Sequence, residues 1–270
     1  MVSIKTKEEI ALIKESGHIT YLTHQYLKSL IKPGITTKYI DDEAGKFIRE
    51  HGGIPSCLGY EGYPRNICVS VNDEVVHGIG SDRVLKEGDI VTLDICTLYK
   101  GYHSDSAWTY PVGKISRENE RLLHHTEKML FVGLKEVKDG AHLNNIGARI
   151  SEYAHKYHYG VVQELCGHGV GRELHEDPDV LNYGKYNTGM KLKTGMVIAV
   201  EPMITAGSRH INILDDDWTI VTRDGKNSAH FEHTVAVHSS LQYARNSGCQ
   251  TRSYPGATAN LPHGRKEEHR

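Results

Sequence analysis

The sequence lacks long apolar segments and has little net charge, and each absence excludes a class of protein. No stretch approaches the roughly 20 consecutive apolar residues that a membrane-spanning helix requires. The first residues, MVSIKTKEEIALIKESG, carry charges where a secretory signal peptide needs an apolar run. A formal net charge of −2 gives no overall basic field for nucleic acid or an anionic membrane. We therefore expect a cytoplasmic protein without a membrane or specific nucleic-acid partner.

Cysteine is also scarce, and its number is odd. None of the five cysteines forms a C-x-x-C pair, which argues against a structural zinc site and against a disulfide framework. Reduced thiols are expected. The 38% of hydrophobic residues and 24% of charged residues are ordinary for a globular protein. A chain of 270 residues can form one large domain or two small ones.

Two aspartates lie in a segment whose pattern is otherwise that of a β-hairpin. In LDICTLYKGYHSDS (residues 93–106), β-branched and apolar residues flank a possible tight turn at Lys100-Gly101. A turn centred on Tyr99-Lys100 places Asp94 directly opposite Asp105, where like charges destabilise a sheet, and a turn one residue longer keeps them neighbours. Either one aspartate caps a turn or faces solvent, or a cation or a shared proton lies between the carboxylates.

The predicted elements occur twice in the same order. A capping box begins the first helix, and each pair of helices is broken by a K-x-G segment and followed by strands. LKEGDIVTLD (residues 85–94) and LKTGMVIAVE (residues 192–201) match, and both end in a carboxylate. Helices are expected over residues 6–31, 37–50, 116–137 and 143–157, and strands over 66–71, 90–99, 102–110, 160–162, 196–200 and 229–237.

This repetition predicts one domain built from two pseudo-symmetric halves. The domain is expected over residues 1–245, with repeats at about 5–112 and 116–240. Residues 246–270 are polar and without periodicity, and they are predicted to form a flexible tail.

Pseudo-symmetry would bring four carboxylates together. Asp94 and Glu201 would occupy equivalent strands, and Glu232 lies on the run that corresponds to the strand of Asp105. Four inward carboxylates cannot share a small space without cations, so two divalent ions are expected. His168 and His175 lie within the glycine-rich segment CGHGVGRELHEDP, and one imidazole would favour a first-row transition metal.

These residues and their surroundings, GHGVGRELHEDP, VEPMI and FEHT, resemble the metal-binding set of type I methionine aminopeptidases. The resemblance covers roughly residues 4–237. It implies an α+β pita-bread fold, with a curved antiparallel sheet covered by helices and a dinuclear site at its centre. The implied metal ligands are Asp94, Asp105, His168, Glu201 and Glu232, with Asp105 and Glu232 bridging two ions drawn from Mn, Fe, Co or Zn.

The same resemblance implies the substrate site. His77 and His175 match two catalytic histidines that are not metal ligands, and the implied pocket for a methionine side chain is formed by Cys57, Tyr60, Tyr63, Cys68 and Trp218. Aromatic rings and polarizable sulfur suit a flexible thioether. Asn72 and Ser228 resemble a site for one Na or K ion.

Two positions depart from the family pattern. Gly80 stands where the family usually has proline, which predicts a looser turn beside His77. Leu174 stands where a larger aromatic is common, which predicts a wider pocket.

The implied reaction is removal of the N-terminal methionine from nascent polypeptides. A water or hydroxide between two metals would attack the first peptide bond, with Glu201 accepting its proton. His175 would stabilise the oxyanion, and His77 would bind near the leaving nitrogen. Because the implied substrate is a nascent polypeptide, a contact with the ribosome is one expectation, although no basic stripe in the sequence indicates it. A monomer is expected.

Two other interpretations share this fold. An aminopeptidase or dipeptidase for Xaa-Pro bonds uses the same five ligands but generally adds an N-terminal domain. A non-catalytic binding module would have lost ligands, whereas all five are present here.

Overall fold

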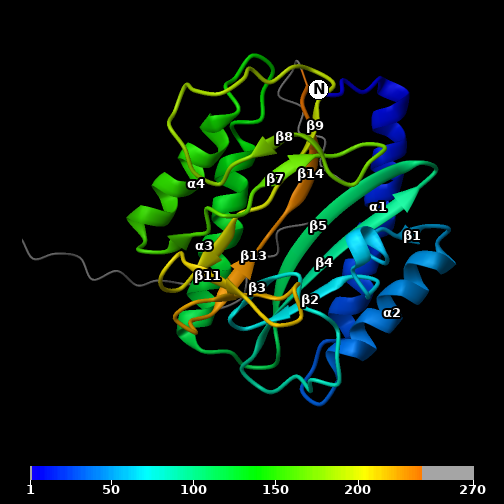
Figure 1. Cartoon of the computed structure of the whole chain (residues 1–270), viewed down its shortest axis with the longest axis vertical. Helices are drawn as coiled ribbons and strands as arrows, with labels where there is room; N and C mark the ends of the chain where they lie inside the picture. Colours follow the sequence, from blue (N-terminus) through cyan, green and yellow to red (C-terminus); the bar gives the residue numbers. More distant parts are fainter. Residues whose placement is uncertain (1, 239–270) are drawn as a thin grey trace, which may run out of the picture.

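The computed structural model describes residues 2–238, and four long helices frame its strands (Figure 1). The predicted tail, residues 246–270, lies outside the described residues. The described helices are α1 (Lys7–Leu30), α2 (Thr37–Glu50), α3 (Arg117–Leu134) and α4 (Asn144–Lys156), with a short 3₁₀ turn at Tyr60–Gly62.

The helix boundaries follow the capping signals of the sequence. Thr6 accepts a hydrogen bond from the backbone of Glu9, whose side chain in turn binds the Thr6 N–H, so the predicted capping box is confirmed. Thr36 and Ser116 cap α2 and α3, each accepting one backbone N–H through its side chain and without a reciprocal capping box.

The strands form four antiparallel sheets. Their bounds are β1 (Ile54–Pro55), β2 (Cys68–Val71), β3 (Glu74–Val76), β4 (Ile90–Tyr99), β5 (Tyr102–Pro111), β6 (Gly160–Val161), β7 (Gly167–Gly169), β8 (Glu176–Val180), β9 (Val197–Val200), β10 (Met203–Thr205), β11 (Ile211–Ile213), β12 (Ile220–Thr222), β13 (Ser228–His230) and β14 (His233–Ala236). All described pairings between these strands are antiparallel, and the α+β prediction is confirmed.

The two halves place corresponding strands in corresponding positions. In the first, β4 lies between β2 and β5; in the second, β9 lies between β7 and β14. Helix α1 packs against β4 and β5, whereas α3 packs against β9, β10 and β13. In Figure 1, α3 and α4 lie toward the left of the molecule and α1 and α2 toward the right.

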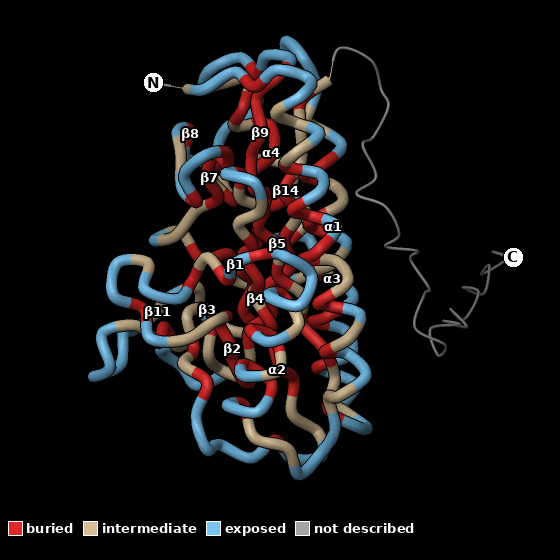
Figure 2. Tube along the Cα trace, turned by 90° about the vertical axis from the view of Figure 1, so that its right-hand side faces the viewer, coloured by how far each residue is buried: buried red, intermediate tan, exposed pale blue. Residues whose placement is uncertain are grey.

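Two main apolar clusters fill the space between helices and strands. One joins α1 and α2 to β2 and β4, and the other joins α3 and α4 to β9, β10 and β13. Figure 2 shows buried backbone running along β4, β5 and β9 in the middle of the molecule. Among the described helices, none is both long and apolar enough to cross a membrane.

The predicted hairpin exists, but its predicted register is wrong. Lys100 and Gly101 both have positive φ, at 50° and 82°, which makes a two-residue turn of the type that suits the twist of a hairpin. Tyr99 therefore pairs with Tyr102. Each residue of β4 is paired with a β5 residue two positions later than a turn centred on Tyr99-Lys100 would give. Asp94 lies opposite Ala107 and not opposite Asp105.

The predicted strand over residues 229–237 is interrupted at Glu232. β13 pairs with β10, whereas β14 pairs with β9, so the chain passes from one sheet to another between them. At the break, the Glu232 N–H donates to the carbonyl of Ala107 in β5, 2.8 Å away. This change of sheet places Glu232 against the first half of the molecule.

Candidate metal centre

Six acidic and imidazole side chains and one thiol from both halves converge where the sheets meet. The described residues contain three overlapping groups whose ligand atoms lie within 4.8 Å of one another: Asp105, His168 and His175; Asp94, Cys96 and Asp105; and His168, Glu201 and Glu232. Together these groups include every residue predicted to bind metal. They come from β4, β5, β7, the end of β9 and the break before β14.

Asp94 and Asp105 lie diagonally across the hairpin on one face of the sheet. Cys96 pairs with Asp105, and side chains two residues apart on a strand share a face, so Asp94 is one step along from Asp105. Burial and the charge of Asp105 raise the pKa of Asp94 well above its usual range. The carboxyl group of Asp94 therefore favours a proton or a cation close to it.

His168 lies between two of the carboxylates. Its Nδ1 lies 2.8 Å from the carbonyl oxygen of Gly169, and its Nε2 lies 3.6 Å from Asp105 and 3.5 Å from Glu201. A hydrogen bond from Nδ1–H to Gly169 leaves Nε2 directed at the carboxylates, as in histidines that bind metals.

The pKa values of this pair follow from their contact. Burial alone would lower the pKa of His168, but Asp105 and Glu201 outweigh it and raise that pKa to about 9. Burial alone would raise the pKa of Asp105, but His168 outweighs it and holds that pKa at about 2. A positive charge is thus stabilised at the point where the carboxylates meet.

Glu232 supplies a test of whether a cation fits this cluster. Its side chain is 1% exposed, and its Oε1 has no hydrogen-bond partner among the described residues. Burial, Asp105 and Glu201 raise its pKa well above the usual range. A buried carboxylate oxygen without a partner is costly, and a metal ion would satisfy it. The donor set of four carboxylates and one imidazole fits a divalent cation.

The two histidines predicted to act in catalysis lie at the edge of the cluster. The His175 ring lies 4.1 Å from the His168 ring, and its Nδ1 is 2.7 Å from the Tyr60 hydroxyl. The His77 ring makes an edge contact with Trp218 at 6.4 Å. Burial and neighbouring histidine charge lower the pKa of both imidazoles, which favours their neutral forms at neutral pH.

The predicted pocket residues form one apolar cluster next to the carboxylates. Its buried members are Cys57, Tyr63, Cys68, Cys96 and Leu174, with Tyr60, Ile79 and Trp218 packed against them. The Tyr63 hydroxyl donates to the carbonyl of Gly78 at 2.8 Å, which fixes the ring in place. The Trp218 indole meets the Tyr63 ring edge-on at 5.1 Å. Aromatic rings and thiols thus pack together beside the acidic cluster.

Comparison with known proteins identifies the family. Residues 11–239 match metallopeptidase family M24. The chain is 53% identical over 237 residues to methionine aminopeptidase 1 of Bacillus subtilis (strain 168), covering 88% of this chain and 96% of that protein. This chain belongs to the M24 family.

Solved structures of M24 proteins share the fold. The crystal structure of methionine aminopeptidase from Rickettsia prowazekii matches with a TM-score of 0.88 and 39% identity, covering 89% of this chain and 97% of that one. The Xaa-Pro dipeptidase from Bacillus anthracis matches with a TM-score of 0.71 and 27% identity, covering 87% of this chain but 59% of that one. The pita-bread architecture expected from the sequence is confirmed.

The remaining sequence-based assignments concern the rim of the M24 site. Asn72 and Ser228 are brought together, since the Ser228 N–H donates to the Asn72 carbonyl at 2.8 Å, and a monovalent cation there stays a prediction. A Cβ at Gly80 would lie 3.0 Å from the Cβ of Asp41 on α2, so a small residue suits this close approach. Leu174 is buried in the pocket, and the wider pocket it predicts stays a prediction.

Sequence reasoning missed two side chains at the M24 centre. Cys96 shares the sheet face of Asp94, and strand periodicity from Asp94 could have revealed it. His230 is 1% exposed, and its Nε2 lies 3.6 Å from Glu201. No sequence signal distinguishes His230 from an ordinary core histidine.

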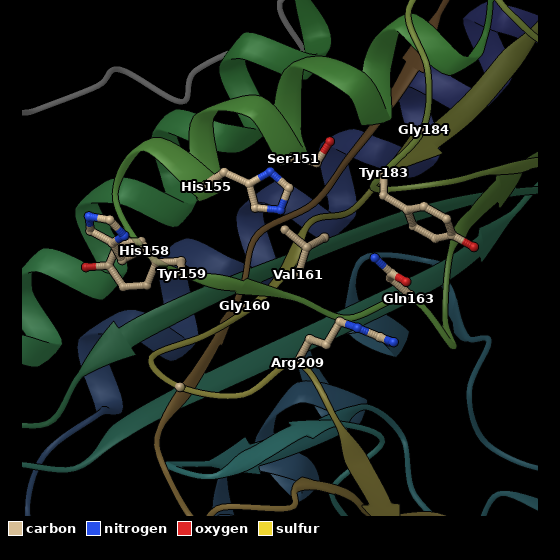
Figure 3. Close-up of a pocket in the computed structure, with 11 residues that line it drawn as sticks. Ser151, His155, His158, Tyr159, Gly160, Val161, Gln163, Tyr183, Gly184 and Arg209 are labelled. Carbon is tan, nitrogen blue, oxygen red and sulfur yellow. The ribbon is translucent and has the colours of Figure 1, made fainter.

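A second concave region lies on the α4 side and shares no residue with the M24 centre. It is lined by residues of α4, β6 and the 207–209 segment, including His155, Gln163 and Arg209 (Figure 3). Arg209 is already paired with Glu164 at 3.4 Å. This region contains none of the predicted site residues.

Proposed function

We propose that this M24 chain is a methionyl aminopeptidase, a metal-dependent hydrolase that removes the N-terminal methionine from nascent proteins and peptides. One observation carries the proposal: a buried cluster of four carboxylates and one imidazole directly adjoins an apolar cluster of thiols and aromatic rings. The named relatives and the nearly complete match to their length support the same activity.

We assign two divalent ions to Asp94, Asp105, His168, Glu201 and Glu232. Hard carboxylate oxygens and one imidazole suit Mn, Fe, Co or Zn. When bound, such ions provide Lewis acidity that lowers the pKa of a water and polarises the scissile carbonyl. The unpartnered oxygen of Glu232 supports this assignment.

Glu201 is the proposed proton acceptor for the attacking water. Its carboxylate lies at the end of β9, 9% exposed, between His168 and His230. The side-chain amide of Asn182 donates to the Glu201 carbonyl at 2.9 Å and fixes the backbone that carries it. A base held in this position can take a proton from water and return it to the leaving amine.

His175 is the proposed donor to the developing oxyanion. A hydrogen bond from the Tyr60 hydroxyl to Nδ1, consistent with their 2.7 Å separation, would leave Nε2 protonated and free to donate. The lowered pKa of His175 keeps this neutral form available. His77, on the opposite side beside Trp218, would bind near the leaving nitrogen.

The pocket is proposed to select methionine at the first position. Its thiols and the edges of Tyr63 and Trp218 offer polarizable contacts to a flexible thioether. Negative charge next to the pocket would hold the free α-amine of the substrate, which restricts cleavage to chain ends. A ribosome contact, a monomeric state and a cytoplasmic location stay predictions.

Two alternatives are less well supported. The chain is 27% identical to the Bacillus anthracis Xaa-Pro dipeptidase with a TM-score of 0.71, whereas it is 39% identical to the Rickettsia prowazekii methionine aminopeptidase with a TM-score of 0.88. A binding module without activity would not need the complete set of metal-binding side chains that the described residues retain.

Asp105→Asn tests the proposed function. The change preserves side-chain volume but removes the charge at the centre of the cluster, so the variant should hold fewer divalent ions and lose at least about 100-fold in hydrolysis. Metal content and release of methionine from Met-Gly-Met-Met should be measured on the same sample. Unchanged activity would refute the assignment.

A further inference from the structure

The thiol of Cys96 points at the same carboxylates that are proposed to bind metal. Cys96 is the cross-strand partner of Asp105, and it shares a sheet face with Asp94 two residues earlier on β4. Its Sγ lies 3.0 Å from Oδ1 of Asp105 and 4.0 Å from Oδ1 of Asp94. Ligand atoms of all three side chains lie within 4.8 Å of one another.

This spacing is close to that of ligands around a single ion. Metal–sulfur bonds are about 2.3 Å and metal–oxygen bonds about 2.0–2.2 Å, so neighbouring ligand atoms on one ion are on the order of 3–4 Å apart. Small rotations of the three side chains would therefore suffice to place all three atoms on one cation. Cys96 is 4% exposed, so its thiol faces the carboxylates and the pocket and not bulk water.

We infer that Cys96 supplies a sulfur ligand to the ion held by Asp94 and Asp105, which makes this half of the centre selective for thiophilic divalent metals. This inference rests on the metal centre of the proposed function. Thiolate sulfur favours Zn²⁺, Co²⁺ and Fe²⁺, whereas an all-oxygen site favours Mn²⁺ and Mg²⁺. On binding, a metal–sulfur bond forms, the S–H bond breaks, and the proton passes to solvent.

A second thiol supports the sulfur from outside the metal site. Cys57 is buried in the same cluster as Cys96, and its backbone neighbour Ser56 donates to the Cys96 carbonyl at 2.9 Å. An S–H donor next to a metal-bound sulfur tunes that ligand and holds its position. Cys57 is absent from every group of potential ligands among the described residues.

Cys68 provides a matched control. It is buried in the same pocket, at 6% exposed, and it is the β2 partner of Asp94 in the adjacent ladder. Despite this position, it belongs to none of the described ligand groups. Cys68→Ser therefore makes the same chemical change beside the same carboxylate without removing the inferred ligand.

Cobalt binding tests the inference directly. The full chain, freed of metal with a chelator, is titrated with Co²⁺ while near-ultraviolet absorption and bound cobalt are recorded. A thiolate on Co²⁺ gives a charge-transfer band that oxygen and nitrogen ligands do not give. We expect this band in the wild type and in Cys68→Ser, and its loss in Cys96→Ser with cobalt still bound.

Competition between metals gives a second readout. Cys96→Ser should weaken Zn²⁺ binding by about 10- to 100-fold, the range typical when a metal site loses a supporting interaction, and should leave Mn²⁺ binding unchanged. Two results would overturn the inference about Cys96 and leave the proposed metal centre unaffected. One is that the wild type binds cobalt without showing the charge-transfer band, and the other is that the band survives in Cys96→Ser. Failure of the wild type to bind cobalt would instead contradict the proposed metal centre.

Discussion

At the scale of single residues, the position of Asp105 shows why this cluster needs a cation. Its carboxylate meets Cys96 on one side and His168 on the other, and its backbone N–H donates to Thr234 at 3.0 Å. These contacts fix Asp105 next to Glu201 and Glu232, which are also buried. Like charges held this closely are stable only when a proton or a metal lies among them.

A mutational test should distinguish the two histidines proposed to act in catalysis from the proposed metal ligands. His77→Ala and His175→Ala should each lower kcat/KM by about 10²- to 10⁴-fold, because each removes a hydrogen bond to the reacting groups. Metal content should stay at the wild-type level in both, since neither is among the proposed ligands. His155→Ala, in the exposed region on α4, is the control and should keep full activity. Loss of metal in either catalytic variant would place that histidine among the ligands.

The stability of the metal-free protein should depend on pH through His168. The pKa of His168 is raised from 6.5 to about 9, so its contribution is fully present below pH 6.5 and is lost as pH rises through about 9. The free energy of unfolding should therefore fall by up to about 3 kcal/mol across this window. Urea titrations at several pH values in chelator measure the slope. His168→Asn should remove this dependence of the unfolding free energy on pH. The same slope in His168→Asn as in the wild type would refute its assignment to His168.

At the scale of elements, the hairpin shows what its local sequence could predict. The capping residues, the β-branched runs and the Lys100-Gly101 turn were sufficient to predict α1, α2, β4 and β5 closely. The register depended on which two residues occupy the turn, and the positive φ of Lys100 is not evident from a lysine. Because side chains alternate between the two faces of a sheet, an error of two residues in the register leaves every side chain on its predicted face. Asp94 and Asp105 therefore still share one face of the sheet.

Two threonines join the strands of the two halves. Thr109 on β5 exchanges two hydrogen bonds with the backbone of His230, and Thr234 on β14 exchanges two with the backbone of Asp105. These contacts bind the backbone next to Glu232 and Asp105, where the centre is assembled. They connect segments that are distant in sequence, and no local pattern predicts them.

Replacing either threonine by valine should loosen this junction. The change keeps the shape but leaves buried backbone groups without partners, so Thr109→Val and Thr234→Val should each cost about 1–3 kcal/mol of unfolding free energy. Thr234→Val should also weaken metal binding, because it removes a bond to Asp105. Denaturant unfolding and metal titration measure both effects. The exposed Thr194→Val should shift stability by less than about 0.5 kcal/mol, and equal effects there would contradict the argument.

At the scale of the whole molecule, the centre lies between halves that each supply part of it. β4 and β5 carry Asp94 and Asp105, whereas β7, the end of β9 and the β13–β14 break carry the other three proposed ligands. The five residues could be predicted because their types and local contexts resemble a known set. The approach of His230 to Glu201 could not, since it depends on tertiary packing that no local pattern in the sequence indicates.

Metal binding should therefore stabilise the entire fold. An ion bound by both halves of the native state but not by the unfolded chain adds about 2.7 kcal/mol at 100 times its Kd. Thermal unfolding should show a higher Tm with Mn²⁺ or Co²⁺ than in chelator, with both halves unfolding together. Asp105→Asn should lose most of this shift, and a full shift in that variant would mean that the stabilising ion binds elsewhere.

The central claim is that this centre cleaves after an N-terminal methionine, and product analysis tests it most directly. The metal-loaded wild-type chain is incubated separately with Met-Gly-Met-Met and with a peptide whose second residue is proline and whose first is not methionine. We expect release of free methionine from the first peptide and little cleavage of the second. Preferential release of the residue before proline, or no hydrolysis of either peptide with Mn²⁺, Co²⁺ or Fe²⁺, would contradict it.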